Sequence, residues 1–301
     1  MPRSHDRSHF YKYVTANTAE KILESGQFLW SAPHLFNDPF DHQVTYKFPF
    51  TSAEIADKLC EVQERISFGE IEPEIVQQKP LGTLSLKLRN RELQDKEKDK
   101  VLSEFRKGAD ETASLLGDYQ ENVNNLLIEF LSHSRVFCVS ETNENVVMWS
   151  HYSEQHRGAV IKLNCVDKVD DNLLIARPIK YAIEFPEYIS LIDWVEEQFG
   201  LKIIDYEDLA FKLAYIKHRD WSYEREWRVH IPLMPNMPVG DGTSLFSKDP
   251  SVFGALYLGC RMPQSTQERL TTIARRRYPR MEIYQAVKSK TSFALNLEKI
   301  K

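Results

Sequence analysis

The chain has 301 residues, 42 % of them hydrophobic, and a formal net charge of −5 at pH 7. This length and hydrophobic content allow a substantial buried core, whereas the negative charge argues against nucleic-acid binding over the whole surface and leaves room only for a local basic groove. The four cysteines are widely spaced without a Cys-x-x-Cys pair, so neither a zinc knuckle nor a disulfide framework is indicated.

No segment of the sequence predicts secretion or membrane insertion. Residues Met1 to His9 are polar and no apolar segment follows them. No stretch approaches the roughly 20 apolar residues that cross a bilayer. We therefore expect a cytoplasmic protein in a reducing compartment, without a membrane partner.

The N-terminal part predicts a strand, a helix and a second strand. Residues 10–14 form a short aromatic strand, and residues 15–25 carry helix formers that end at Gly26. Residues 28–31 predict the second strand. The block from Pro33 to Asp41 is rich in Pro, Asn and Asp, which predicts a structured turn.

Residues 51–133 differ from the rest of the chain in composition. They are charged, poor in aromatic residues and mostly helical in pattern. We interpret this stretch as a helical insertion in a single α+β domain that spans residues 1–301.

Strand character resumes after the insertion. Residues 136–140 and 158–163 are apolar runs with residues 148–152 between them, which predicts a strand-turn-strand unit. Farther along, residues 205–216 predict an amphipathic helix, and residues 224–231 alternate as a strand does.

The last core strands are predicted at residues 255–259 and 281–284, with a helix between them. The whole pattern gives about six to eight strands and five or more helices in an irregular order, which favours an α+β fold. We expect a mixed, mostly antiparallel core sheet with flanking helices.

Four clusters combine aromatic rings with ionisable or hydrogen-bonding groups, at residues 11–13, 37–41, 140–158 and 221–228. Such groups are costly to bury unless their polar ends find partners. Each cluster also has a structural interpretation: half-buried tyrosines, an Asx turn, a satisfied core histidine, or an ion pair across a sheet. The candidate site residues are Tyr11, Lys12, Tyr13, Asn37, Asp38, Ser140, Trp149, His151, Tyr152, His156, Arg157, Glu226 and Arg228.

Spacing favours a pocket wall over a metal site. His151 and His156 are five residues apart, which does not match the i, i+4 spacing of a helical metal pair. If residues 221–228 form a strand, Glu224, Glu226 and Arg228 share one face. No metal is expected.

The four clusters together resemble a widespread prokaryotic family, the domain of unknown function 2971. The motifs that carry the resemblance are Tyr11-Lys12-Tyr13, Phe36-Asn37-Asp38-Pro39-Phe40-Asp41, Met148-Trp149-Ser150-His151-Tyr152 with His156-Arg157-Gly158, and Trp221-Ser222-Tyr223-Glu224-Arg225-Glu226-Trp227-Arg228. They occur in order over most of the chain, and the family itself implies no reaction.

The order of strand, helix, Gly26, second strand and a late strand with Glu226 is similar to the ADP-ribosyltransferase superfamily. That resemblance implies an enzyme that consumes NAD, acts on an unknown protein or nucleic-acid target, and works in a toxin, phage-defence or stress-response setting. It assigns NAD binding to Tyr11 or Lys12 and to Ser140 and Tyr152, and catalysis to Glu226. Where that superfamily usually presents His or Arg on the first strand, this chain has Lys12 between two tyrosines.

The chemistry of these side chains fits that reaction. A carboxylate such as Glu226 stabilises the oxocarbenium-like cation that forms when the nicotinamide–ribose bond breaks. The nicotinamide cation prefers an aromatic face, which Tyr152 or Trp149 offers. Arg157 or Arg228 would clamp the pyrophosphate.

Two other hypotheses remain open. In a divalent-metal nuclease or phosphodiesterase, Asp38, Asp41 and Glu226 would hold Mg²⁺, but Arg228 stands where such enzymes carry a lysine and cannot act as a base. In a non-catalytic sensor or interaction module, aromatic side chains would line a small-molecule pocket. Glu226 and His151 are important in all three, and we predict them as the catalytic pair of the transferase.

Overall fold

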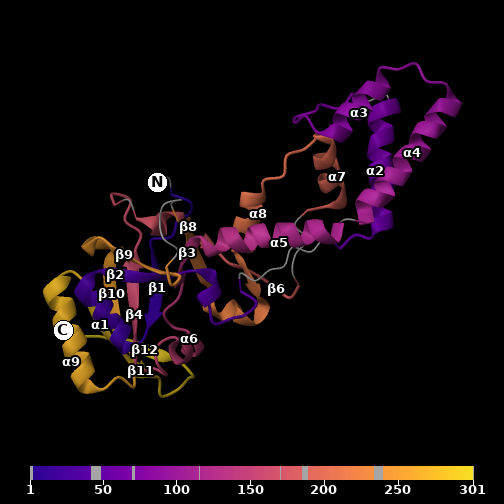
Figure 1. Ribbon diagram of the computed structural model, residues 1–301. Coiled ribbons are helices and arrows are strands. Elements are labelled where there is room, and N and C mark those ends of the chain that lie inside the picture. Colours follow the sequence, from indigo (N-terminus) through magenta and orange to yellow (C-terminus); the bar gives the residue numbers. More distant parts are fainter. Residues whose placement is uncertain are drawn as a thin grey trace. The chain divides into compact units, whose positions relative to one another are not determined.

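The computed structural model describes residues 3–41, 49–69, 72–114, 116–169, 171–184, 189–233 and 240–300. The fold is α+β, as predicted. The chain divides into two compact units, one of residues 1–43, 130–184 and 213–301 and one of residues 44–129 and 185–212 (Figure 1). The single domain with a helical insertion stays a prediction.

The first unit is built on a ten-stranded, mostly antiparallel sheet. Eight of its strands lie side by side in the order β12 (Leu295–Lys299), β11 (Glu282–Lys288), β10 (Phe253–Leu258), β4 (Ala159–Asn164), β1 (His9–Val14), β3 (Ser134–Ser140), β2 (Gln27–Ser31) and β9 (Thr243–Ser247). Strand β8 (Glu226–Pro232) pairs with β3, and β5 (Arg177–Pro178) pairs with β8. Among the described strands of this sheet, only β10 and β11 pair in parallel.

The sheet has more strands than expected because its short members carry weak sequence signals. Strands β5, β9 and β12 have no buried residue, so they lack the apolar run that marks a core strand. A separate pair of parallel strands, β6 (Lys180–Ala182) and β7 (Ile216–His218), belongs to the same unit.

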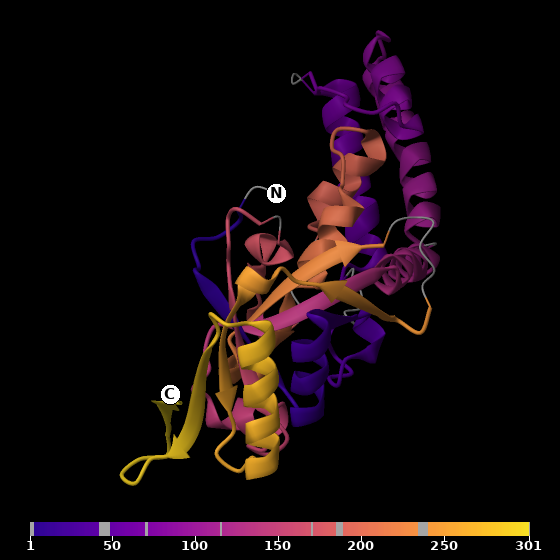
Figure 2. The ribbon, with the colours of Figure 1, turned by 90° about the vertical axis from the view of Figure 1, so that its left-hand side faces the viewer.

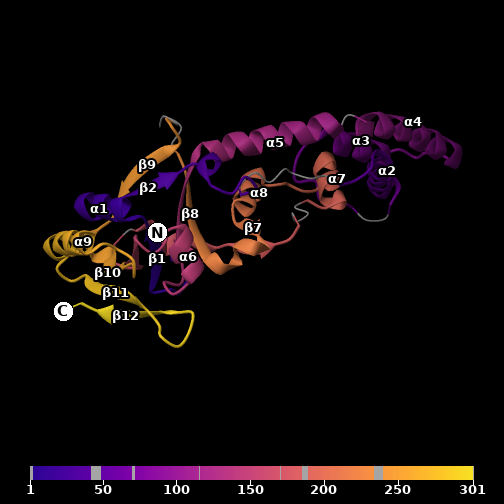
Figure 3. The same cartoon turned by 90° about the horizontal axis from the view of Figure 1, so that it is seen from below.

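Helices α1 (Ala16–Ser25) and α9 (Gln264–Arg277) pack side by side in the first unit (Figures 1 and 3). Helix α1 begins after Thr15, whose side chain accepts a hydrogen bond from the Thr18 amide. It ends at Gly26, which is left-handed with φ of 73°. Buried apolar residues of both helices and of the sheet form one continuous core.

The two predicted strands of the strand-turn-strand unit are present as β3 and β4, and helix α6 (Val146–His151) takes the place of the turn between them. Asn145 begins it, because its side chain accepts hydrogen bonds from the amides of Val147 and Met148. The same side chain donates to the Tyr223 carbonyl at 2.9 Å. A contact distant in sequence therefore fixes the start of this helix.

The second unit is helical. It contains α2 (Ser52–Phe68), α3 (Pro80–Arg89), α4 (Asp95–Ser114), α7 (Leu191–Phe199) and most of α5 (Leu116–Ser132) and α8 (Tyr206–Leu213). Helix α2 begins with a capping box between Thr51 and Glu54. Among the described residues, no helix is both long and apolar enough to cross a membrane.

Candidate functional site

A cavity of about 440 Å³ lies in the first unit where strands β1 and β3 separate. Within the described residues these strands pair at a single position, Tyr11 with Ser140, and β3 continues beside β8. The Lys12 side chain bridges the gap and donates to the Cys138 carbonyl at 2.7 Å. The lining residues are Tyr11, Lys12, Tyr13, Leu35, Phe36, Asn37, Asp41, Cys138, Val139, Ser140, Met148, His151, Tyr152, Lys217, Glu224 and Glu226.

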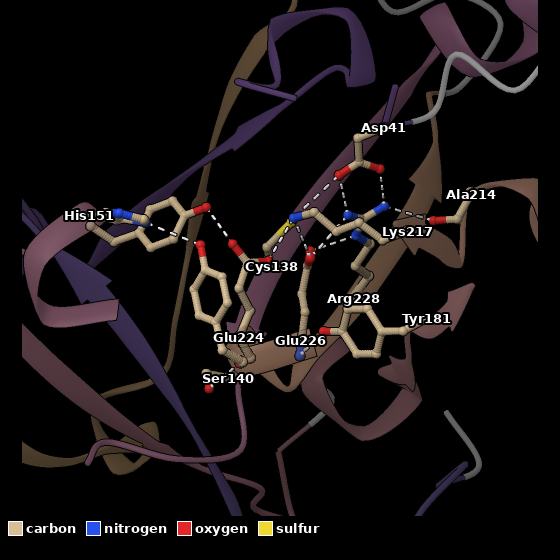
Figure 4. A network of polar contacts seen from close by, with 12 residues as sticks. Asp41, Cys138, Ser140, His151, Tyr181, Ala214, Lys217, Glu224, Glu226 and Arg228 are labelled. Carbon is tan, nitrogen blue, oxygen red and sulfur yellow. Dashed lines mark hydrogen bonds and ion pairs between the residues drawn. The ribbon is translucent and has the colours of Figure 1, made fainter. Parts of the chain in front are cut away.

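Five charged side chains form a continuous network at one wall of this cavity (Figure 4). Arg228 donates to both carboxylate oxygens of Asp41, at 2.8 and 2.5 Å, and from Nε to Glu226 at 2.6 Å. The ammonium of Lys217 donates to Glu224 at 2.6 Å and to Glu226 at 3.1 Å. None of the five side chains is more than 7 % exposed. Because buried charges are costly without partners, each member of the network depends on the others.

The two glutamates differ in how readily they bind a proton. Burial opposes the ionisation of Glu226, but Arg228 and Lys217 outweigh it and lower its pKa to about 2. Burial and the charge of Glu226 raise the pKa of Glu224, while Lys217 and Tyr152 act against this shift. Neighbouring carboxylates with separated pKa values can divide the roles of charge stabiliser and proton carrier.

Burial also shifts the pKa values of two further cavity residues, Lys12 and Tyr152. Desolvation lowers the pKa of Lys12, whose ammonium lies 4.8 Å from the centroid of the Phe137 ring. Desolvation and the charge of Glu224 raise the pKa of Tyr152, so its hydroxyl keeps its proton and donates to Glu224 at 2.5 Å. Tyr152 is therefore a fixed donor to the carboxylate with the raised pKa.

Residues 221–228 do not form the continuous strand that the alternation suggested. The 3₁₀ helix η3 (Arg219–Glu224) ends at Glu224, Arg225 is left-handed with φ of 43°, and β8 begins at Glu226. Glu226 and Arg228 share a face of β8, whereas Glu224 reaches the same wall from η3. The turn at Arg225 brings both carboxylates to one lysine.

The fold brings residues from all four predicted clusters to this cavity. Of the predicted site residues, the lining contains Tyr11, Lys12, Tyr13, Asn37, Ser140, His151, Tyr152 and Glu226. Ser140 and Tyr13 use their hydroxyls on main-chain carbonyls, of Glu224 at 2.7 Å and of Thr142 at 3.0 Å. These two residues hold the wall together, while the exposed His151 contacts the Tyr223 hydroxyl at 3.1 Å.

Arg228 and Trp149 lie outside the lining. Arg228 is fully buried, and its guanidinium binds Asp41, Glu226 and the Ala214 carbonyl. A pyrophosphate would have to displace these partners, so Arg228 acts as an internal counter-ion rather than the predicted clamp. Trp149 is also fully buried and donates to the Asn143 carbonyl at 2.8 Å, which makes it part of the core rather than a stacking platform.

Asp38, His156 and Arg157 are likewise absent from the lining. The Asp38 carboxylate accepts from the Phe40 amide at 2.9 Å, which is the geometry of an Asx turn. His156 stacks on Trp149 with an interplanar angle of 7° and lines a different cavity. Arg157 is exposed.

Two of the three carboxylates that the nuclease hypothesis assigns to Mg²⁺ already have cationic partners. Asp41 and Glu226 both bind Arg228, and Asp38 is engaged in its turn. Within the part of the chain that the structure describes, no group of three or more His, Cys, Asp and Glu side chains is placed to hold a metal ion. The donor set at this wall is therefore suited to internal ion pairing.

Sequence reasoning missed several members of the site, three of which take part in its hydrogen bonds. Glu224 stands in the same cluster as Glu226, so its signal was present but its role was not recognised. Lys217 carries no local signal, and Tyr181, whose hydroxyl accepts from the Glu226 amide at 2.8 Å, lies outside the four clusters. Their partners are known only once the chain is folded.

Residues 148–229 match the family model described as protein of unknown function (DUF2971). The matched segment contains most of α6, all of η3 and most of β8, and hence Lys217, Glu224 and Glu226 of the network. This match supports the family resemblance found from the motifs. Searches of the curated proteins and of the solved structures found no match.

Proposed function

We propose that this protein breaks the nicotinamide–ribose bond of NAD and transfers the ADP-ribose to an acceptor. The observation that carries this proposal is the ionised Glu226 at the wall of a cavity that also contains Glu224, a carboxylate with a raised pKa. The reaction builds positive charge on the ribose, and a preorganised carboxylate stabilises that charge. Glu226 has this role.

The cavity suits parts of NAD. Its volume lies within the range of small-molecule sites. The rings of Tyr11 and Tyr152 offer faces to the nicotinamide cation, each worth about 0.5 to 2 kcal/mol. Among the described residues, Lys12 donates to one carbonyl, so its other N–H groups are available to a phosphate.

Glu224 acts as the base that takes the proton of the acceptor. When the C1′–N bond breaks, its electron pair leaves with nicotinamide, which becomes neutral. The acceptor attacks C1′ with a lone pair, and its proton passes to the Glu224 carboxylate, whose raised pKa favours that transfer. The reaction is balanced without a further co-reactant.

The first experiment is a thermal-shift assay of the purified full-length chain with NAD, with and without EDTA. NAD at 100 times its dissociation constant would add about 2.7 kcal/mol of stability if it binds only the native state. We expect an upward shift that EDTA leaves unchanged, together with release of nicotinamide. A shift that depends on Mg²⁺ or Mn²⁺ but not on NAD would favour the nuclease instead, and an NAD shift without turnover would favour the sensor.

The matched variants are Glu226→Gln and Glu282→Gln. Both remove one glutamate charge from the same sheet, but Glu282 is exposed and pairs with Lys299 at the surface. We expect nicotinamide release to be lost in Glu226→Gln, with NAD binding retained, and to be unchanged in Glu282→Gln. Full activity in a folded Glu226→Gln protein would refute the mechanism.

A further inference from the structure

A second cavity of about 540 Å³ lies in the first unit, at the loop that joins β11 to β12. This loop projects from the sheet (Figure 2). The cavity is lined by residues 288–295 together with Val146, His156, Cys260 and Arg261. It shares no residue with the first cavity.

The lining of this second cavity is basic. It includes Arg261, Lys288 and Lys290 and no acidic residue. The three cations are exposed, and none of them forms an ion pair or side-chain hydrogen bond with another described residue. In a chain with a net charge of −5, this is a local excess of positive charge that is free to bind an anion.

An aromatic ring stands at the rim of the cavity. The Phe293 side chain is fully exposed. Its loop is held in shape because Ser289 Oγ accepts from the amides of Thr291 and Ser292, both at 3.3 Å, and the Ser289 amide donates to the Ala294 carbonyl at 3.0 Å. The ring is thus displayed by an ordered turn and contributes nothing to the core.

Helix α6 contributes residues to both cavities. Its first residue, Val146, lines the second cavity, while Met148 and His151 line the first. Six helical residues span about 9 Å. The second cavity therefore shares a short helix with the cavity that contains the carboxylates.

We infer that the second cavity and Phe293 form a binding site for single-stranded nucleic acid. Arg261, Lys288 and Lys290 bind consecutive phosphates, and a base stacks on Phe293. A single strand is favoured over a duplex because an exposed ring needs an unstacked base. It is favoured over a membrane because the cations line a concave surface.

This site goes beyond the proposed function and does not depend on it. If both hold, a strand bound here is placed as the acceptor of ADP-ribose. Binding is measured without NAD, so either proposal can fail while the other stands.

The test is fluorescence anisotropy of the full-length chain with labelled oligo-dT and oligo-U of about 12 nucleotides, a length typical of such sites. Three phosphate contacts to a single strand predict a slope of log affinity against log salt of about −2, which is about a 20-fold loss between 50 and 200 mM salt. We expect Lys290→Ala to reduce that slope by about 0.7. Phe293→Ala should weaken binding by about fivefold or more at an unchanged slope.

The matched control is Arg276→Ala. Arg276 is an exposed cation on α9, outside the cavity, and its removal changes the net charge as Lys290→Ala does. The changed side chains are exposed, so none of the variants should impair folding. Equal losses in Lys290→Ala and Arg276→Ala would show charge-driven binding without a site and overturn the proposal.

Three other results would also overturn it: unchanged binding in Phe293→Ala, equal affinity for a duplex of the same length, or binding to phosphatidylserine vesicles with the same residue dependence but none to the oligonucleotides. Retained oligonucleotide binding in Glu226→Gln would support a site separate from the carboxylates.

Discussion

Replacing Glu226 by glutamine removes a charge from the buried network and keeps the shape of the side chain. The network lowers the pKa of Glu226 from 4.5 to about 2. At 1.36 kcal/mol per pKa unit, this shift corresponds to about 3 kcal/mol of folding stability at neutral pH. Glutamine keeps hydrogen-bonding capacity but loses this charge interaction with Arg228 and Lys217.

The pH dependence distinguishes this effect from a general loss of packing. Because the folded pKa is below the unfolded one, the stabilisation is complete above pH 4.5 and is lost as pH falls towards 2. The same linkage leaves less than half of this stabilisation near pH 3. We therefore expect the loss of unfolding free energy in Glu226→Gln, relative to the parent protein, to fall by more than half between pH 7 and about pH 3.

Guanidinium denaturation at both pH values measures the unfolding free energy of Glu226→Gln and of the parent protein, with Glu282→Gln as the surface control. Glu282 pairs with Lys299 near solvent, so its variant should stay within about 0.5 kcal/mol of the parent. A Glu226→Gln deficit that is absent at neutral pH, or equal at both pH values, would contradict the assignment of an ionised, ion-paired Glu226.

Four further substitutions test two other members of the network and two glycines. Lys217→Met removes the cation shared by Glu224 and Glu226 and should cost about 3 to 5 kcal/mol in denaturant unfolding; an unchanged midpoint would show that the bridge contributes nothing. Glu224→Gln should slow ADP-ribose transfer by about 10² to 10⁴-fold in single-turnover assays and leave NAD binding intact, whereas unchanged transfer would remove Glu224 from the mechanism. Gly158→Ala should strongly destabilise the protein because a Cβ there would lie 2.2 Å from the Val14 carbonyl oxygen. Gly108→Ala, in open space on α4, should stabilise it by about 0.5 to 1 kcal/mol. Calorimetry of the two variants compares their unfolding temperatures.

The sequence determined those elements whose signals are local. Helix α1 follows from helix formers that end at Gly26, and in the structure Thr15 and Gly26 cap it. The core strands β1, β4 and β10 follow from apolar runs that need no knowledge of their partners. The α+β class was therefore predictable.

Helix α6 was not predictable from its own residues. Its sequence contains two valines and a tryptophan, which favour strands in isolation. The Asn145 cap is held by the Tyr223 carbonyl, 78 residues away, and this contact overrides the local preference. The left-handed Arg225 likewise has no local signal, because most residues avoid that conformation and only the surrounding fold holds it there.

The candidate site, like the fold, was predictable from the sequence only in part. Clustered aromatic and charged residues identified Tyr11, His151, Tyr152 and Glu226 as candidate site residues, since such groups are costly to bury unless their polar ends find partners, and all four line the first cavity. Sequence could not identify which charges would pair, because Coulomb energy depends on distance in space. Arg228 binds Asp41 across 187 residues, and this tertiary contact decided that Arg228 is a buried counter-ion rather than a ligand clamp.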